Sequence, residues 1–112
     1  MKLDIQPLNQ VPGILIRIAS DNLDAGNSNE FKQQIFPHLE TNPNVFIDLG
    51  ALNFVDSSGL GALLSCLRTM NNKENQLKLV GLTKPVRALF ELVRMHRIFS
   101  IYNTVDEALA SL

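Results

Sequence analysis

Short runs of apolar residues alternate along this chain with longer segments in which apolar residues recur every three or four positions. Five of the runs have the apolar and β-branched character of strands. They cover residues 3–8, 14–18, 45–49, 77–81 and 98–102. Four segments have the spacing of amphipathic helices. They begin after Asn27, Asp56, Thr83 and Thr104. The pattern therefore predicts elements in the order β-β-α-β-α-β-α-β-α.

Strands that alternate with helices are typical of right-handed crossovers and a parallel sheet. The first two strands are separated only by a short turn at Pro12-Gly13, so we expect them to form an antiparallel hairpin. The chain has 112 residues, which is the size of one domain. We therefore expect a single α/β domain over residues 1–112, with a four- to five-stranded mixed sheet.

The predicted helix ends rest on polar residues and on proline. Asn27 with Glu30 and Thr104 with Glu107 have the spacing of capping boxes, and Thr83 is a further N-cap. Pro37 is expected to kink or end the first helix. The third helix should face the sheet with four apolar residues. They are Val86, Leu89, Phe90 and Val93.

Composition excludes several classes of protein. A net charge of −1 is far from the basic character of a nucleic-acid binder. Cys66 is the only cysteine and lies in an apolar run, which argues against a disulfide framework. The start has no apolar core of a signal peptide, and no run is long enough to span a bilayer. We therefore expect a cytoplasmic protein that binds no nucleic acid and does not insert into a membrane.

The carboxyl ends of parallel strands are the usual binding sites of such a sheet, which directs attention to the loops at residues 20–27, 54–61 and 82–84. In the second loop, Asp56-Ser57-Ser58-Gly59-Leu60-Gly61 places two hydroxyls at a helix start, where an anion is favoured. A simple helix cap explains the same residues. One serine would suffice as a cap, however, so the additional hydroxyl also suggests a docking or modification surface.

Other chemistries lack their residues. No Lys follows Gly61 as a phosphate-binding loop requires, and no Gly stands two places before Ser58 as a nucleophile elbow requires. Asp48 ends a strand but lacks the acidic cluster of a phosphoacceptor site, so we interpret it as a loop hydrogen-bonder. Two isolated histidines and one thiol give no metal-ligand spacing. We expect no catalytic residue, metal or cofactor.

Three segments together resemble the STAS domain of anti-sigma factor antagonists. They are the Asp56–Gly61 turn after an apolar strand, the Leu23-Asp24-Ala25-Gly26-Asn27 loop, and the helix start Lys84-Pro85-Val86-Arg87-Ala88-Leu89-Phe90. The resemblance covers essentially the whole chain and implies a STAS fold. It also implies a partner-switching regulator of transcription, which binds an anti-sigma factor and frees the target of that factor.

The resemblance further implies a phosphoprotein without catalysis of its own. The phosphoacceptor would be Ser58, with Ser57 as second choice, and Asp56 would order the turn. The partners would be a serine/threonine kinase of the histidine-kinase-like ATPase fold, which doubles as the anti-sigma factor, and a serine phosphatase. The partner interface would comprise the acceptor turn and the loop before the first helix. Its residues would be Asp56, Ser57, Ser58, Gly59, Leu60, Gly61, Asp21, Asn22, Asp24 and Asn27.

One segment departs from the family pattern. The loop after the second strand commonly reads Gly-Glu-Leu-Asp in the family, and here it reads Ser20-Asp21-Asn22-Leu23-Asp24, which leaves the identity of the partner open. Two other functions also stay open. One is a constitutive subunit of a larger complex, transporter-associated or stressosome-like, in which Ser57 and Ser58 only cap the helix. The other is a small-anion or nucleotide binder.

Overall fold

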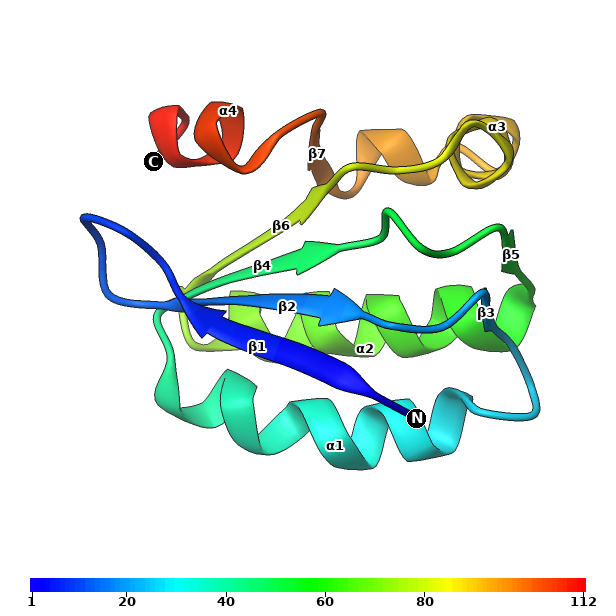
Figure 1. Ribbon diagram of the computed structural model, residues 1–112, viewed down its shortest axis with the longest axis horizontal. Helices are drawn as coiled ribbons and strands as arrows, with labels where there is room; N and C mark the ends of the chain where they lie inside the picture. Colours follow the sequence, from blue (N-terminus) through cyan, green and yellow to red (C-terminus); the bar gives the residue numbers. More distant parts are fainter.

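The computed structural model describes residues 1–112 as a mixed five-stranded sheet in the order β1-β2-β4-β6-β7 (Figure 1). Strand β1 pairs antiparallel with β2, and the other neighbours are parallel. The fold class and the N-terminal hairpin predicted from the sequence are confirmed. The strands are β1 (Leu3–Pro7), β2 (Ile14–Ile18), β4 (Asn44–Asp48), β6 (Gln76–Val80) and β7 (Ser100–Tyr102).

Helices lie on both sides of the sheet. Figure 1 shows α1 (Ser28–Thr41) and α2 (Ser57–Asn72) together on one side, and α3 (Lys84–Leu92) and α4 (Val105–Ala110) on the other. A short 3₁₀ helix, η1 (Met95–Arg97), follows α3. No helix is both long and apolar enough to cross a bilayer.

The two faces of the sheet are covered unequally. Alternate residues of β2, such as Ile16 and Ile18, belong to a main core of 23 buried residues that includes α1 and α2. On the opposite face, Leu15 belongs to a much smaller cluster that packs on Ala108 of α4. The main core therefore fixes α2, and with it the residues at the helix start.

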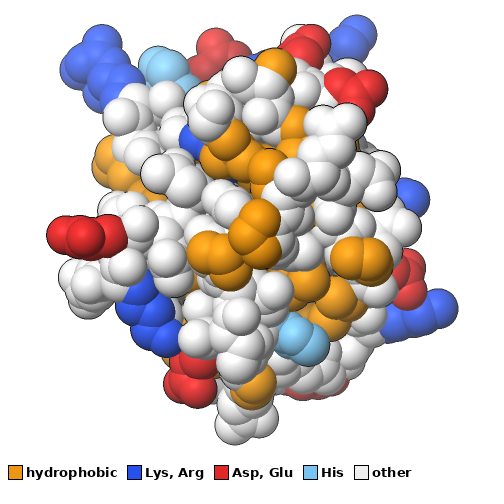
Figure 2. All heavy atoms as spheres, turned by 90° about the vertical axis from the view of Figure 1, so that its left-hand side faces the viewer, with side chains coloured by type: hydrophobic (Ala, Val, Ile, Leu, Met, Phe, Trp, Pro, Cys, Tyr) orange, Lys and Arg blue, Asp and Glu red, His pale blue; other side chains and the backbone are white.

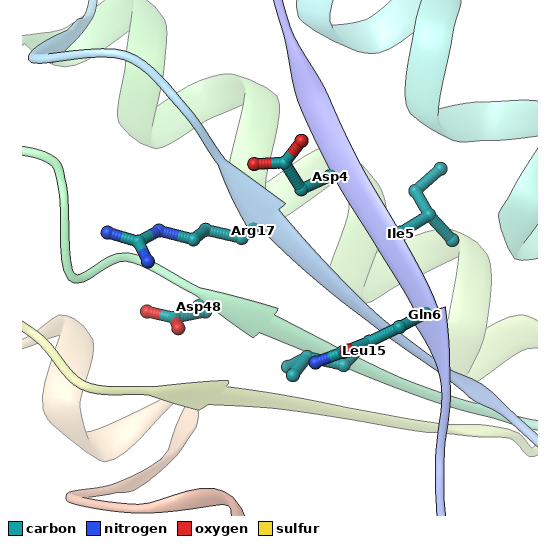
Figure 3. A pocket seen from close by; sticks show the side chains of 6 residues that line it. All are labelled: Asp4, Ile5, Gln6, Leu15, Arg17 and Asp48. Atoms are coloured by element: carbon teal, nitrogen blue, oxygen red, sulfur yellow. The ribbon is translucent and has the colours of Figure 1, made fainter.

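Part of the second face is uncovered and polar. Arg17 on β2 lies beside Asp4 of β1 and Asp48 of β4, and the three line an open pocket of about 200 Å³ (Figure 3). Asp48 also accepts a hydrogen bond from the backbone N–H of Gly50 at 2.8 Å. The interpretation of Asp48 as a loop hydrogen-bonder is thus confirmed.

Two short strands were not predicted. Strand β3 (Asn22–Leu23) and strand β5 (Phe54–Val55) pair in parallel as a separate two-stranded sheet. In Figure 1 this small sheet lies at the end of the molecule where α2 begins. It joins two segments that are about thirty residues apart in the sequence, and both belong to the predicted binding loops.

Pro37, which was expected to kink or end α1, does not end it, because the helix continues to Thr41. Two other expectations for the helices were wrong. Asn27 is the N-cap residue of α1, but its side chain makes no cap, and Glu30 instead pairs with the N-terminal ammonium group. Val93 lies beyond the end of α3 and is exposed rather than packed on the sheet.

The other two predicted N-caps are correctly placed. Thr104 accepts a hydrogen bond from the backbone N–H of Glu107, as expected for a capping hydroxyl. Thr83 is the N-cap residue of α3, but its hydroxyl donates to the carbonyl oxygen of Leu52 at 2.6 Å instead of capping the helix. That bond fastens the loop before α3 to the segment that leads into β5.

Candidate functional site

Helix α2 begins at the predicted turn. Asp56 is the N-cap residue, and its Oδ1 accepts a hydrogen bond from the backbone N–H of Gly59 at 2.9 Å. Ser57 and Ser58 are the first two helical residues, and both are exposed. The prediction that Asp56 orders this turn is confirmed, and both hydroxyls face solvent, where an enzyme or a partner can reach them.

The second carboxylate oxygen of Asp56 binds a different part of the chain. Its Oδ2 accepts a hydrogen bond from the backbone N–H of Ala25 at 3.0 Å. The backbone N–H of Asp56 in turn donates to the carbonyl oxygen of Leu23 at 3.3 Å. A single side chain therefore connects the Asp56–Gly61 turn, the predicted acceptor turn, to the loop before α1.

These hydrogen bonds also set the ionisation of the carboxyl group. The N–H of Gly59, and after it that of Ala25, hold the pKa of Asp56 below its ordinary value of 3.8, against an opposing effect of desolvation. The group is therefore a carboxylate at neutral pH. The Asp56 carboxylate therefore already occupies the Gly59 N–H at this helix start, and its negative charge disfavours a free phosphate or nucleotide there.

Polar side chains brace the loop before α1 from within. Asn27 accepts from the backbone N–H of Asp24 and donates to the carbonyl oxygen of Asn22, both at 2.9 Å. Asn22 donates to the Asp24 carboxylate at 2.8 Å, and the backbone N–H of Gly26 donates to its other oxygen at 2.9 Å. The loop is thus an ordered surface, in which the side chains of Asn22, Asp24 and Asn27 form hydrogen bonds within the loop itself.

Asp21 joins this loop to the small sheet. Its carbonyl oxygen accepts from the backbone N–H groups of Asn53 at 2.8 Å and Phe54 at 3.2 Å, and its carboxylate accepts from the Asn53 side chain at 2.7 Å. The structure therefore brings Asp21, the loop and the acceptor turn together at one edge of the sheet, as the strand order predicted.

Two residues of the predicted interface point inward. Leu60 belongs to the main core, and Gly59 is buried against the backbone of β3. A Cβ atom at Gly59 would lie 2.1 Å from the carbonyl oxygen of Leu23. These two residues shape the turn, but neither contributes a side chain to its surface, which corrects the prediction.

Farther along α2, the small residues differ in exposure. Gly61 is exposed, and a Cβ atom there would meet nothing within 4 Å. Ser65 is half-buried, and its hydroxyl donates to the carbonyl oxygen of Gly61 at 3.0 Å. Ala62, the residue after Gly61, is buried. The exposed residues in the first turns of α2 are therefore Ser57, Ser58 and Gly61.

Sequence reasoning missed one surface residue. Phe54 on β5 is 54% exposed and stands two positions before Asp56. A phenylalanine in an apolar run is ordinarily assigned to the core. The only signal for its exposure was the alternation of strand side chains, which a strand of two residues is too short to establish.

The structure has neither an accessible thiol nor a cluster of metal ligands. Cys66, which lies in an apolar run of the sequence, is buried, and desolvation raises the pKa of its thiol to about 12. No three His, Cys, Asp or Glu side chains lie close enough together to hold a metal ion. The distinctive chemistry of the site is thus a pair of exposed hydroxyls on a rigid, acid-capped turn.

The turn and the sheet order together are typical of one family, and the family comparison agrees. The STAS domain family matches residues 6–108, so the chain belongs to the STAS domain family. Among its relatives is the anti-sigma F factor antagonist of Paenibacillus polymyxa, 28% identical over 102 residues, which cover 89% of this chain and 87% of the relative.

Solved structures share the fold. A crystal structure of an anti-sigma factor antagonist from Mycobacterium paratuberculosis aligns with a TM-score of 0.85 at 22% identity and covers 98% of this chain and 92% of that one. The Bacillus protein SpoIIAA in its phosphorylated form aligns with a TM-score of 0.70 at 18% identity, and the alignment covers 98% of each chain.

The same fold occurs in a different setting. A sulfate transporter family protein from Wolinella succinogenes aligns with a TM-score of 0.73 at 16% identity and covers 87% of this chain and 81% of that one. The fold alone therefore does not separate a regulator from a transporter-associated domain.

Proposed function

We propose that this protein is an anti-sigma factor antagonist whose binding is controlled by phosphorylation of Ser58, with Ser57 as the second choice. In its unphosphorylated form it binds an anti-sigma factor that is also a serine/threonine kinase of the histidine-kinase-like ATPase fold, and so frees the target of that factor. A serine phosphatase restores the unphosphorylated form. The relatives named anti-sigma factor antagonists support this assignment.

The observation that carries the proposal is the exposure of both serines on a turn whose capping is supplied by another residue. Asp56 accepts the N–H of Gly59, so neither serine hydroxyl is needed to begin α2. No side-chain hydrogen bond engages either hydroxyl within the protein. Both groups are therefore available to a kinase, and a change in either leaves the cap in place.

The physical effect of phosphorylation follows from its charge. A phosphoryl group adds about −1.5 to −2 charges and three acceptor oxygens. At the start of a helix the macrodipole favours negative charge, so the fold tolerates the group. In a tight interface built around a hydroxyl, the same dianion must be desolvated beside Asp56. A cost of about 2.7 kcal/mol suffices for a hundredfold loss of affinity, which releases a partner.

Phosphopeptide mapping tests the proposal. The protein is incubated with ATP, Mg²⁺ and each purified histidine-kinase-like serine/threonine kinase of the source organism, then digested and analysed by mass spectrometry. We expect one phosphoryl group on Ser58, which is lost in Ser58→Ala and retained in Thr69→Ala, a matched hydroxyl on the same helix. Phosphorylation of Ser57 alone would transfer the assignment to the second choice.

Variants separate the switch from the fold. Ser58→Asp should keep the circular dichroism spectrum and melting temperature of the wild type but bind the kinase at least tenfold more weakly. Ser58→Ala should bind the kinase whether or not ATP is present. A kinase that binds both variants as tightly as it binds the wild type would contradict the switch.

The alternative is a constitutive STAS subunit of a larger complex, transporter-associated or stressosome-like. Its support is the fold shared with the Wolinella succinogenes transporter family protein. The mapping experiment distinguishes it, because a constitutive subunit acquires no phosphoryl group on either serine. A small-anion or nucleotide binder has less support, because the Asp56 carboxylate already accepts the N–H of Gly59 at the helix start and that of Ala25 in the neighbouring loop.

A further inference from the structure

Phe54 is the one exposed aromatic residue of the protein. The chain has six phenylalanines, one tyrosine and no tryptophan, and every aromatic side chain except that of Phe54 is buried or half-buried. The other large exposed apolar residues are aliphatic. Exposure of a phenylalanine forgoes the hydrophobic stabilisation that its burial would supply, so Phe54 keeps an apolar surface that is available to a partner.

The fold does not require a phenylalanine at this position. Val55 and Leu52, on either side of Phe54, belong to the main core and supply the apolar contacts of this segment. Because strand side chains alternate, burial of Val55 turns the ring of Phe54 outward. Phe54 is 54% exposed, although β5 lies beside α3.

The backbone that carries the ring is rigidly held beside the proposed acceptor. The N–H of Phe54 donates to the carbonyl oxygen of Asp21, and β5 pairs with β3 opposite Asn22. Asp56, two residues later, caps α2 and binds the loop before α1. The backbone that carries the ring, the loop before α1 and the start of α2 are therefore held together by hydrogen bonds.

We propose that Phe54 is the apolar anchor of the docking surface and inserts into an apolar pocket of the kinase that phosphorylates the turn. This inference rests on the proposed function and names a binding determinant outside the Asp56–Gly61 turn. A rigid aromatic side chain in a pocket is a common source of binding energy in protein interfaces. The anchor supplies affinity, and the phosphoryl group on the neighbouring turn opposes it.

The ring by itself is too small to hold any partner, a second copy of this chain included. A buried phenylalanine accounts for at most about 250 Å², whereas a stable interface needs about 800 Å² from each partner. The backbone N–H groups of Phe54 and of the polar residue Asn53 are hydrogen-bonded to Asp21, and the two exposed serines follow three and four residues later in the chain. A partner must therefore also engage the polar turn and loop, which is what a kinase that acts on Ser58 has to do.

Isothermal titration calorimetry tests the anchor with the kinase that phosphorylates the wild type. Phe54→Ser should weaken binding about 30-fold or more, the loss expected for a dominant aromatic anchor. Phe54→Leu should lose less, because it keeps part of the apolar surface. Leu112→Ser is the matched control, since Leu112 is 46% exposed at the C-terminus. Figure 1 places the C-terminus at the end of the molecule away from β5, and Figure 2 views that end, where hydrophobic side chains form small patches among polar atoms.

The outcomes separate the anchor from the proposed function. If the kinase phosphorylates Ser58 but binds Phe54→Ser as tightly as wild type, the anchor is overturned and the proposed function stands. If no kinase binds or phosphorylates the wild type, both fall. A wild-type dimer that depends on Phe54 in sedimentation, with kinase affinity unchanged, would assign the ring to self-association instead. If Phe54→Ser melts well below wild type, the affinity of the kinase for Phe54→Leu is measured instead. A Phe54→Leu affinity equal to that of the wild type overturns the anchor.

Discussion

Replacement of Gly59 by alanine tests the packing that positions the acceptor turn. The new Cβ atom would lie 2.1 Å from the carbonyl oxygen of Leu23 and 2.9 Å from Cγ1 of Val55. Contacts under 3.0 Å are essentially never found for a real Cβ atom, so the start of α2 must move by about 0.9 Å. The neighbouring atom is backbone, which cannot rotate away. The movement also strains the bond from the Asp56 N–H to Leu23.

The expected cost follows from comparable overpacking. Forced insertion of a methyl group into a packed site costs about 1–3 kcal/mol, and the better helix propensity of alanine returns at most about 1 kcal/mol. Because the contact is with backbone at 2.1 Å, we place the cost at the upper end of that range, about 2–3 kcal/mol. The net loss is then about 1–2 kcal/mol, or roughly 4–8 °C in melting temperature. Gly61→Ala is the control on the same turn of helix. Its Cβ atom meets nothing within 4 Å, so stability should stay equal or rise by up to about 1 kcal/mol.

Urea denaturation followed by circular dichroism measures both variants. The packing around Gly59 predicts that the unfolding free energy depends equally steeply on urea concentration in the wild type and both variants, and that only Gly59→Ala has a lower midpoint. The reasoning is refuted if Gly59→Ala matches the wild type, or if Gly61→Ala loses as much stability as Gly59→Ala.

Three further predictions concern the core and the ionisable groups. Leu63→Ala should lose about 2–5 kcal/mol of unfolding free energy in the same assay, because Leu63 is fully buried, and a near-neutral result would mean that the assigned face of α2 is wrong. The lowered pKa of Asp56 implies that its stabilising effect is complete above pH 3.8 and is lost as the pH falls through the lower folded-state pKa. Urea midpoints between pH 6 and 2 should therefore fall more steeply for the wild type than for Asp56→Asn, and parallel curves would contradict this. Cys66, with a pKa raised to about 12, should react with a thiol reagent at pH 8 far more slowly in the folded protein than in urea, and equal rates would show that it is not buried.

The sequence predicts the larger elements because each has a sustained period. The five main strands and four helices, the hairpin and the Asp56 cap all follow from residue patterns over five or more positions or from a strong capping residue. The edge at which Asp21 and the acceptor turn meet follows from strand order alone, since the carboxyl ends of parallel strands share one edge.

Features that depend on contacts between distant segments were not predictable in the same way. Strands β3 and β5 have two residues each and no period, and they exist because the backbone N–H groups of Asn53 and Phe54 meet the carbonyl oxygen of Asp21. Asn27 fails as a side-chain cap because the loop offers it two other hydrogen-bond partners, on Asp24 and Asn22. The inward orientation of Gly59 depends in the same way on the position of Leu23.

The central claim is that one phosphoryl group on the acceptor turn weakens partner binding without unfolding the protein. The most direct measurement is the dissociation constant of the kinase complex for the unphosphorylated protein and for the protein fully phosphorylated on Ser58, with circular dichroism melts of both. We predict at least a hundredfold weaker binding after phosphorylation, with superimposable spectra and melting temperatures within a few degrees. Equal dissociation constants, or a loss of binding that accompanies unfolding, would contradict the claim.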